Sequence, residues 1–230
     1  MIPLRDSVRS RSFPLVNVSI IVINVLAFFY ELSLGAEVDA FFQAYAFTPT
    51  RFLDTLQNEP YNLFALGIPL LTSMFLHGGW MHLIGNMWFL WIFGDNVEDS
   101  MGHKRYIIFY LLAGLGAGLV HFLFNPNSAI PTVGASGAIA SVMGAYMILY
   151  PRGRILTLIP LFIFIQIIEV PAFFFLLFWI LLQMFQGVAS LGAEANVGGV
   201  AWWAHIGGFA IGAVLIFFFR KRGRYRRFGY

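Results

Sequence analysis

Ser136 has the clearest chemical potential in the chain, because it follows the small residues of 131–135 and opens a run of small and apolar residues reaching about position 145. A structural interpretation exists, since serine often caps the N-terminus of a helix and small residues let membrane helices pack closely. The chemical interpretation is that a serine hydroxyl becomes a nucleophile when a base can accept its proton. The choice depends on whether the chain offers a base that can reach Ser136.

His205 is the residue best placed to be that base. Ser136 precedes Arg152 by 16 residues and His205 precedes Arg220 by 15 residues. At a helical rise of about 1.5 Å per residue, the two side chains lie about 24 Å and 22 Å from the same basic edge of a helical bundle. A histidine inside an apolar span is costly, so a functional site is its default interpretation, although a packing histidine bonded to a carbonyl is the structural alternative.

Two further polar residues fall at about this depth. His82 precedes Glu98 by 16 residues, and Asn86 lies one turn along the same helix face. If neutral His205 takes the proton of Ser136 as the hydroxyl attacks a carbonyl, it can return that proton to the leaving amine. His82 and Asn86 can then donate hydrogen bonds to the oxyanion, together with the backbone N–H of Ser136.

A third member of a catalytic triad is not apparent at this depth. The acidic residues Asp95, Glu98 and Asp99 fall at the opposite end of their helix, so we expect a Ser-His dyad whose imidazole is oriented by packing or by the backbone. The remaining histidines are interpreted as structural or incidental: His77, His103 and His121.

The composition indicates that these residues lie in a polytopic membrane protein. The 230 residues are 59% hydrophobic and only 11% charged, and soluble domains carry about 25% charged residues. The absence of cysteine excludes disulfides and thiolate metal sites, and no metal-spaced cluster or phosphate loop is seen, so no cofactor or metal is expected. Residues 1–14 are short and contain Asp6, which argues against a cleaved presequence.

Hydropathy predicts an all-α membrane protein built as a bundle of six transmembrane helices. The predicted spans cover residues 16–34, 80–93, 106–124, 136–150, 171–187 and 200–219. Residues 35–78 form an outer loop with short interfacial helices. The stretch 155–169 is predicted as a re-entrant or interfacial piece. The domain organisation is thus a tail at 1–14, a membrane domain at 15–219 and a basic tail at 220–230.

The basic residues support this count. With six spans, 13 of the 14 Lys and Arg residues fall on one side, which the positive-inside rule makes cytoplasmic along with both termini. Only Arg51 falls outside this pattern, and a seventh span at 155–169 would place the basic tail on the wrong side. The tail is interpreted as a topological anchor beside anionic lipid, so no nucleic-acid partner is expected. Small residues spaced four apart predict close packing of the fourth and sixth spans: Gly137/Ser141/Ala145, Ala140/Gly144 and Gly208/Gly212.

Four segments together resemble the rhomboid family of intramembrane serine proteases. They match the family patterns H-x-x-x-N, G-x-x-x-E, G-x-S-G and A-H-x-x-G-x-x-x-G, in order, at residues 77–86, 93–98, 134–137 and 204–212. The resemblance implies that Ser136 is the nucleophile, His205 the base, and His82 and Asn86 the oxyanion donors. It also implies cleavage of a substrate's transmembrane segment near its outer end, with access from lipid beside the fifth helix.

Two positions depart from the family pattern. Many members carry a Trp-Arg pair before the second helix, where this chain has Ile68-Pro69. Some carry an aromatic ring one turn after the nucleophile that stacks on the histidine, where this chain has Ala140. Both the loop before the second helix and the orientation of His205 must therefore be secured by other residues.

The function predicted from sequence is an intramembrane serine endopeptidase acting on transmembrane-helix proteins in the lipid bilayer. The alternative is a catalytically silent relative that binds and escorts membrane helices, and the presence of both serine and histidine argues against it. A transporter would favour internal repeats, and none is apparent. The expected location is a prokaryotic plasma membrane.

Overall fold

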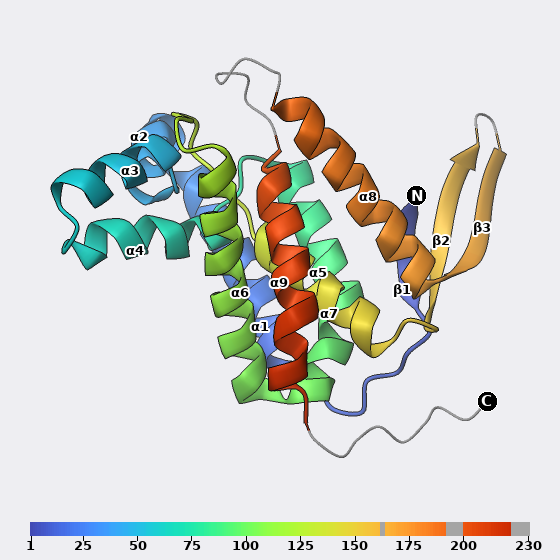
Figure 1. Ribbon diagram of the computed structural model, residues 1–230. Helices are drawn as coiled ribbons and strands as arrows, with labels where there is room; N and C mark the ends of the chain where they lie inside the picture. The colour runs from blue at the N-terminus through green and yellow to red at the C-terminus, as the bar shows by residue number, and fades with distance from the viewer. Residues whose placement is uncertain (162–163, 192–199, 222–230) are drawn as a thin grey trace.

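The structure is a computed structural model that describes residues 1–161, 164–191 and 200–221. A bundle of six long helices forms the body of the protein (Figure 1). Each overlaps one of the predicted spans: α1 (Leu15–Ser33), α5 (Trp80–Met101), α6 (His103–Phe124), α7 (Ser136–Leu149), α8 (Ala172–Ser190) and α9 (Trp202–Phe219). Below, "the Ser136 end" is the end of the bundle where α7 begins, and "the Met101 end" is the end where α5 passes into α6.

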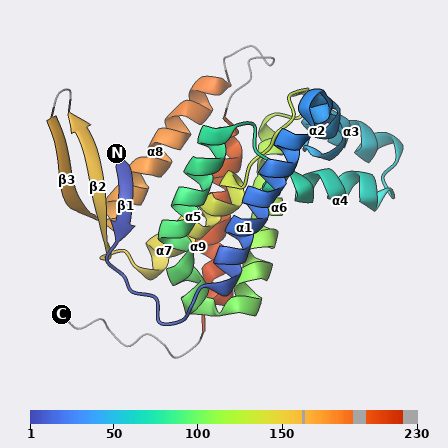
Figure 2. The same ribbon diagram turned by 180° about the vertical axis from the view of Figure 1, so that it is seen from behind.

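Helix length and composition support a multi-pass membrane protein. Within the described residues, four helices are long and apolar enough to cross a membrane, namely α1, α6, α8 and α9. A fifth candidate is the pair formed by residues 63–75 and α5, which are bent by 83° at the break between them. Helix α7 is apolar but only 14 residues long, and it is buried along most of its length in the middle of the bundle (Figure 2).

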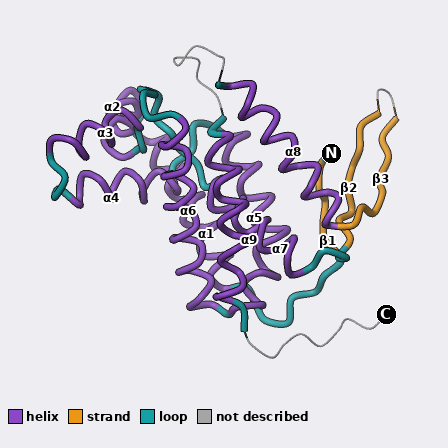
Figure 3. Tube along the Cα trace, viewed as in Figure 1, coloured by secondary structure: helices purple, strands orange, loops and turns teal. Residues whose placement is uncertain are grey.

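The chain is mostly helical, as predicted, but it is not all-α, because it also contains a three-stranded antiparallel sheet beside the bundle (Figure 3). Its strands are β1 (Ile2–Asp6), β2 (Arg154–Leu161) and β3 (Phe164–Pro171), in the order β1-β2-β3. The predicted re-entrant or interfacial piece is therefore a β-hairpin whose two ends meet where Arg154 pairs with Pro171. Its many β-branched residues favour strands, whereas an apolar run alone does not separate strand from helix.

The first residues are also structured, against the prediction of a simple tail. Ile2 pairs with Leu158 and Asp6 with Ile155, which makes β1 an edge strand of the sheet. The indole N–H of Trp88, on α5, donates a hydrogen bond of 2.6 Å to the Pro3 carbonyl oxygen. Strand β1 therefore bridges α5 and the hairpin.

The loop that precedes α5 contains the short helices expected there. They project sideways at the Ser136 end (Figure 1): η1 (Gly35–Glu37), α2 (Val38–Tyr45), α3 (Pro49–Asn58), α4 (Leu63–Thr72) and η2 (Ser73–Phe75). Arg51 donates hydrogen bonds to the carbonyl oxygens of Gln43, Ala44 and Ala46 at the C-terminal end of α2. The Thr72 hydroxyl donates to the Tyr45 carbonyl oxygen at 2.6 Å. These contacts secure the loop in the absence of the Trp-Arg pair.

Helix α5 continues beyond Phe93, where its span was predicted to end, and runs to Met101. The reason is that the polar residues of its last turns have partners from the start of the chain. Buried Glu98 accepts hydrogen bonds from the backbone N–H groups of Val16 at 3.0 Å and Asn17 at 2.7 Å, and so caps the N-terminus of α1. The Asn17 amide in turn donates to the Leu90 carbonyl oxygen at 3.1 Å.

We predict that Glu98→Ala lowers the free energy of unfolding by about 2–4 kcal/mol, because two N–H groups lose a charged acceptor in a buried place. Glu98→Gln should lose less, since one oxygen remains. Thermal unfolding in detergent measures both, with Glu37→Ala at an exposed position as the control. An unchanged midpoint for Glu98→Ala would contradict the capping role.

A second prediction concerns the Asp6 carboxyl, which accepts hydrogen bonds from the Tyr146 hydroxyl at 2.6 Å and the Asn96 amide at 2.9 Å. Burial, reinforced by the nearby Asp95 charge, raises the pKa of Asp6 from 3.8 to about 6. Between those values the folded chain binds more protons than the unfolded chain, so the free energy of unfolding falls as the pH rises.

The wild type should therefore lose stability relative to Asp6→Asn as the pH increases from about 4 to about 6, and the difference should level off above that range. Unfolding midpoints of both proteins across this pH range measure the effect. A constant difference between the two would show that Asp6 keeps its ordinary pKa.

Candidate active site

Ser136 is the first residue of α7, and its hydroxyl does not cap the helix. The capping position is Ala135, and no side-chain hydrogen bond caps α7 within the described part of the chain. The chain reaches this helix through Gly134, whose φ of 125° favours glycine. The Ser136 Oγ instead lies 2.7 Å from Nε2 of His205, on the first turn of α9. The structure thus brings together the serine and histidine that depth estimates placed at one level.

Close packing of α7 and α9 produces this contact. A Cβ atom at Gly208 would overlap the carbonyl oxygen of Gly137, and one at Gly212 would overlap the carbonyl oxygen of Ser141. A Cβ at Gly144 would overlap the Phe209 carbonyl oxygen. The predicted pattern of small residues is therefore confirmed as a backbone-to-backbone interface between these two helices.

The other ring nitrogen of His205 has a partner that the sequence analysis missed. Its Nδ1 lies 2.7 Å from Oε1 of Gln183, a buried residue of α8. The sequence predicts that packing or the backbone orients the imidazole, and the structure adds a side-chain amide that was not expected. The available signal was the presence of two amides, Gln183 and Gln186, within the apolar span predicted at 171–187, since uncharged polar groups inside a membrane also need partners.

Aromatic rings from other helices replace the ring that is missing at Ala140. The indole of Trp179, on α8, lies with its centroid 5.9 Å from the His205 ring at an interplanar angle of 34°. Trp202 meets the same ring edge-on at 6.1 Å. Helix α8 thus supplies both a hydrogen bond and an aromatic surface to His205.

His82 and Asn86 lie on α5 and line the same cleft as Ser136 and His205. A Cβ at Gly134 would be only 2.6 Å from Nε2 of His82, so the turn before Ser136 packs directly on this imidazole. The Asn86 side chain is buried, and its Nδ2 lies 2.9 Å from Nε2 of His77. His77 was interpreted as structural or incidental, and the structure places it as the support of Asn86.

The two remaining histidines lie far apart. His121 lines the cleft with Ser136, and its buried Nδ1 has no hydrogen-bond partner among the described residues. His103 lies at the Met101 end, 2.5 Å from a Glu98 carboxylate oxygen. Within residues 1–161, 164–191 and 200–221, no group of three His, Asp or Glu side chains is arranged to hold a metal ion.

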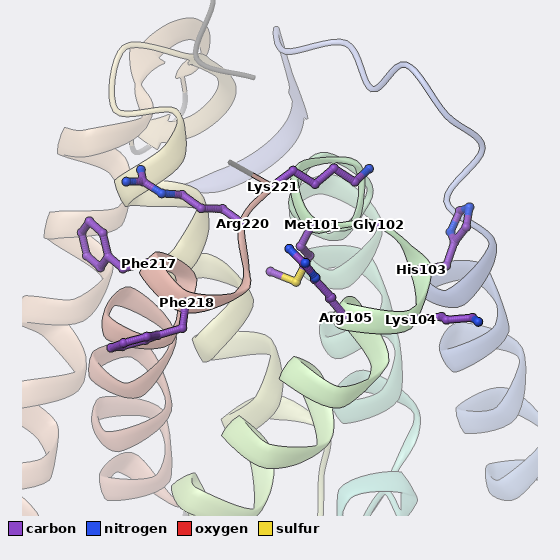
Figure 4. A pocket seen from close by; sticks show the side chains of 9 residues that line it. All are labelled: Met101, Gly102, His103, Lys104, Arg105, Phe217, Phe218, Arg220 and Lys221. Atoms are coloured by element: carbon purple, nitrogen blue, oxygen red, sulfur yellow. The ribbon is translucent and has the colours of Figure 1, made fainter. Parts of the chain in front are cut away.

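A second cavity lies at the Met101 end and is lined by basic side chains (Figure 4). Arg105 donates to the Phe219 carbonyl oxygen at 3.4 Å, and Lys221 donates to the Asp99 carbonyl oxygen at 3.3 Å. Lys104 and Arg220 also line this cavity. The 15 residues between His205 and Arg220 separate it from the Ser136 cleft by about 22 Å along α9.

Comparison with known proteins places this arrangement in a family. The model of the rhomboid domain matches residues 67–222, which is more than half of the chain. Rhomboid-like protein 11, chloroplastic, from Arabidopsis thaliana is 42% identical over 79 residues, covering 34% of this chain and 28% of that protein. Rhomboid protease GluP from Bacillus subtilis (strain 168) is 34% identical over 148 residues, covering 64% of this chain and 25% of that protein.

The human presenilin-associated rhomboid-like protein, mitochondrial, is 32% identical over 99 residues, covering 42% of this chain and 26% of that protein. The chain thus spans only about a quarter of the length of these relatives. The matched region includes α5, α6, α7, α8 and α9, and with them the cleft that contains Ser136 and His205. This protein is a multi-pass membrane protein of the rhomboid family.

Proposed function

We propose that the protein is an intramembrane serine endopeptidase that cleaves transmembrane segments of other membrane proteins through Ser136 and His205. The observation that carries the proposal is the 2.7 Å contact between Ser136 Oγ and His205 Nε2, in a cleft lined by residues of α5, α6, α7, α8 and α9. A neutral imidazole at that distance can accept the hydroxyl proton. Most polar groups in such an interior only satisfy one another, whereas this pair opens on a cleft.

The reaction begins when Ser136 Oγ attacks the carbonyl carbon of a substrate peptide and His205 Nε2 takes its proton. The tetrahedral intermediate collapses as the C–N bond breaks, and the proton on Nε2 passes to the leaving amine. The remaining acyl group is an ester of Ser136. Water then attacks this ester while His205 takes the water's proton, and the carboxylic acid leaves as the proton returns to Ser136.

His82 and Asn86 are proposed as donors to the oxyanion of the tetrahedral intermediate. Asn86 has two amide hydrogens, and one is directed at His77 Nε2, which leaves the second for the substrate. The fixed position of Asn86 means that little reorganisation accompanies the development of charge. The N–H of Ser136, at the first position of α7, has no acceptor within its helix and adds a third donor.

We further propose that all six long helices cross the membrane and that both termini are cytoplasmic. The basic cavity in Figure 4 lies at the end that the positive-inside rule assigns to the cytoplasm, which puts the Ser136 cleft toward the outer surface. Cleavage near the outer end of a substrate follows from that depth. A bacterial plasma membrane is the proposed location, although the named relatives include chloroplast and mitochondrial proteins.

Replacing either member of the pair tests the proposal. Ser136→Ala and His205→Ala should each lower cleavage of a labelled transmembrane substrate on the order of 10⁴-fold or more, since the members of such a unit act together. Both should also abolish labelling by a fluorophosphonate probe. Ser141→Ala, on the same helix with its hydroxyl bonded to the Ala138 carbonyl oxygen at 2.5 Å, is the matched control and should retain activity. Equal cleavage by wild type and Ser136→Ala would show that Ser136 is not the nucleophile, whereas no cleavage by the wild type would leave helix escort as the function.

Asn86→Ala should reduce kcat by about 10²–10³ with little change in KM, because an oxyanion donor acts mainly in the transition state. Initial rates over a range of substrate concentrations in detergent measure the two constants separately. A rise in KM at constant kcat would instead assign Asn86 to substrate binding.

A further inference from the structure

Gln183 forms a directed contact with the site that the proposed reaction leaves unused. Its Oε1 lies 2.7 Å from Nδ1 of His205, and both side chains are only 8% exposed. A carbonyl oxygen only accepts hydrogen bonds, so Nδ1 must carry the proton. The neutral ring then has no proton on Nε2, the nitrogen that lies 2.7 Å from Ser136 Oγ. This tautomer is the one a general base requires.

The part of α8 that carries Gln183 has few other buried groups. Ala172, Phe175 and Leu176 are buried near its start, and beyond them only Gln183 and Gly187 are buried among the residues of this helix. Trp179 falls between Leu176 and Gln183 along the helix, and its indole lies beside the His205 ring. The second half of α8 therefore meets the bundle largely through groups at or near His205.

The contact between the two helices that carry Ser136 and His205 does not depend on α8. Helices α7 and α9 carry them, and those two helices are in contact through Gly208 and Gly212. A displacement of α8 would leave Ser136 and His205 side by side while removing Gln183 from Nδ1. The proton could then move to Nε2, which would leave the ring unable to accept the serine proton.

We propose that Gln183 is a positioning residue that fixes the tautomer of His205, and that it makes the reactive state of the ring depend on α8 lying against α9. The proposal rests on the proposed function of Ser136 and His205. When α8 is displaced from α9, His205 lacks the hydrogen bond that keeps its proton on Nδ1. The ring becomes able to accept the serine proton again when α8 returns. The amide orients the ring without placing a buried charge beside it.

The first test replaces the acceptor while keeping the size of the side chain. Gln183→Met should slow fluorophosphonate labelling of Ser136 about tenfold to hundredfold, the range expected for one lost hydrogen bond to a buried group. Gln186→Met, one turn away and exposed, is the matched control and should label at the wild-type rate. Equal rates for Gln183→Met and the control would overturn the proposal.

Gln183→Glu keeps an oxygen acceptor and adds a charge. It should label faster than Gln183→Met, and the acid limb of its pH–rate profile should move to higher pH, because a neighbouring carboxylate favours the protonated ring. A merely structural role for Gln183 predicts neither the rescue nor the displaced limb. Equally slow labelling of both variants, with the acid limb at its wild-type pH, would therefore refute the positioning role of Gln183.

A readout besides activity separates this proposal from the proposed function. Ring nitrogen chemical shifts in protein carrying ¹⁵N-histidine report the tautomer, with the His205 signals assigned through His205→Ala. The wild type should show a protonated Nδ1 and Gln183→Met a mixture of tautomers. An unchanged tautomer refutes the role of Gln183 even if wild type cleaves substrate, whereas an inactive wild type with the expected shifts refutes only the proteolytic function.

The dependence on α8 is tested by a reversible tether, which the absence of cysteine in the chain makes specific. A Cβ at Gly187 would lie 3.5 Å from Cβ of Trp202, which suits a disulfide between Gly187→Cys and Trp202→Cys. The oxidised protein should label with a small fluorophosphonate at least as fast as the same protein after reduction. Slower labelling in the oxidised form would show that α8 need not lie against α9.

Discussion

The direct backbone contact between α7 and α9 is the constraint on which the rest of this structure depends. Hydrophobic burial does not draw helices together inside lipid, so association relies on close van der Waals packing, which small residues permit. Gly144, Gly208 and Gly212 each face a carbonyl group of the other helix at a distance that leaves no room for a side chain. A larger residue at any of the three would push the helices apart and separate Ser136 from His205.

Two clusters of buried polar groups lie at opposite ends of the bundle in the described part of the chain. At the Met101 end, Glu98 and Asn17 join α1 to α5 through buried hydrogen bonds, and the Tyr106 hydroxyl donates to the Asn17 side chain at 2.8 Å. At the Ser136 end, the Asn86 amide lies within hydrogen-bond distance of the His77 imidazole, and the Gln183 amide within hydrogen-bond distance of the His205 imidazole. The polar groups of the first cluster form hydrogen bonds within the protein interior, whereas in the second cluster the Ser136 hydroxyl and the His205 imidazole line a cleft.

The sequence placed Ser136 and His205 at one level because the positive-inside rule predicts the direction of both helices and the helical rise converts residue counts into depth. It did not reveal Gln183, because depth says nothing about which way a helix is turned about its axis or which neighbour it touches. The continuation of α5 past Phe93 was missed for a related reason. Asp95 and Glu98 looked like a polar end, and their partners come from segments far away in the chain.

The sheet was not predicted for two reasons: β2 and β3 lie in a stretch whose pattern does not distinguish strand from helix, and β1 pairs with β2 from a distant part of the chain. Residues 155–169 are mostly apolar, with Thr157, Gln166 and Glu169 as the polar exceptions, so periodicity did not separate a hairpin from a helix. The third strand is supplied by the first residues of the chain. Pro160 and Pro171 excluded a regular helix, but they did not indicate a partner. Helix boundaries, by contrast, agreed closely for α1, α6, α7 and α9 because each ends at a clear change in polarity or at glycine.

Strand β1 has a consequence for how the protein is made. It is synthesised before α1, yet its partner Leu158 is added only after the polypeptide of α1 to α7 has been synthesised. At about 5–20 residues per second, this edge waits on the order of ten seconds or more without a pairing strand. Strand β1 therefore acquires its pairing strand only late in synthesis, after the polypeptide of α1 to α7 has been made.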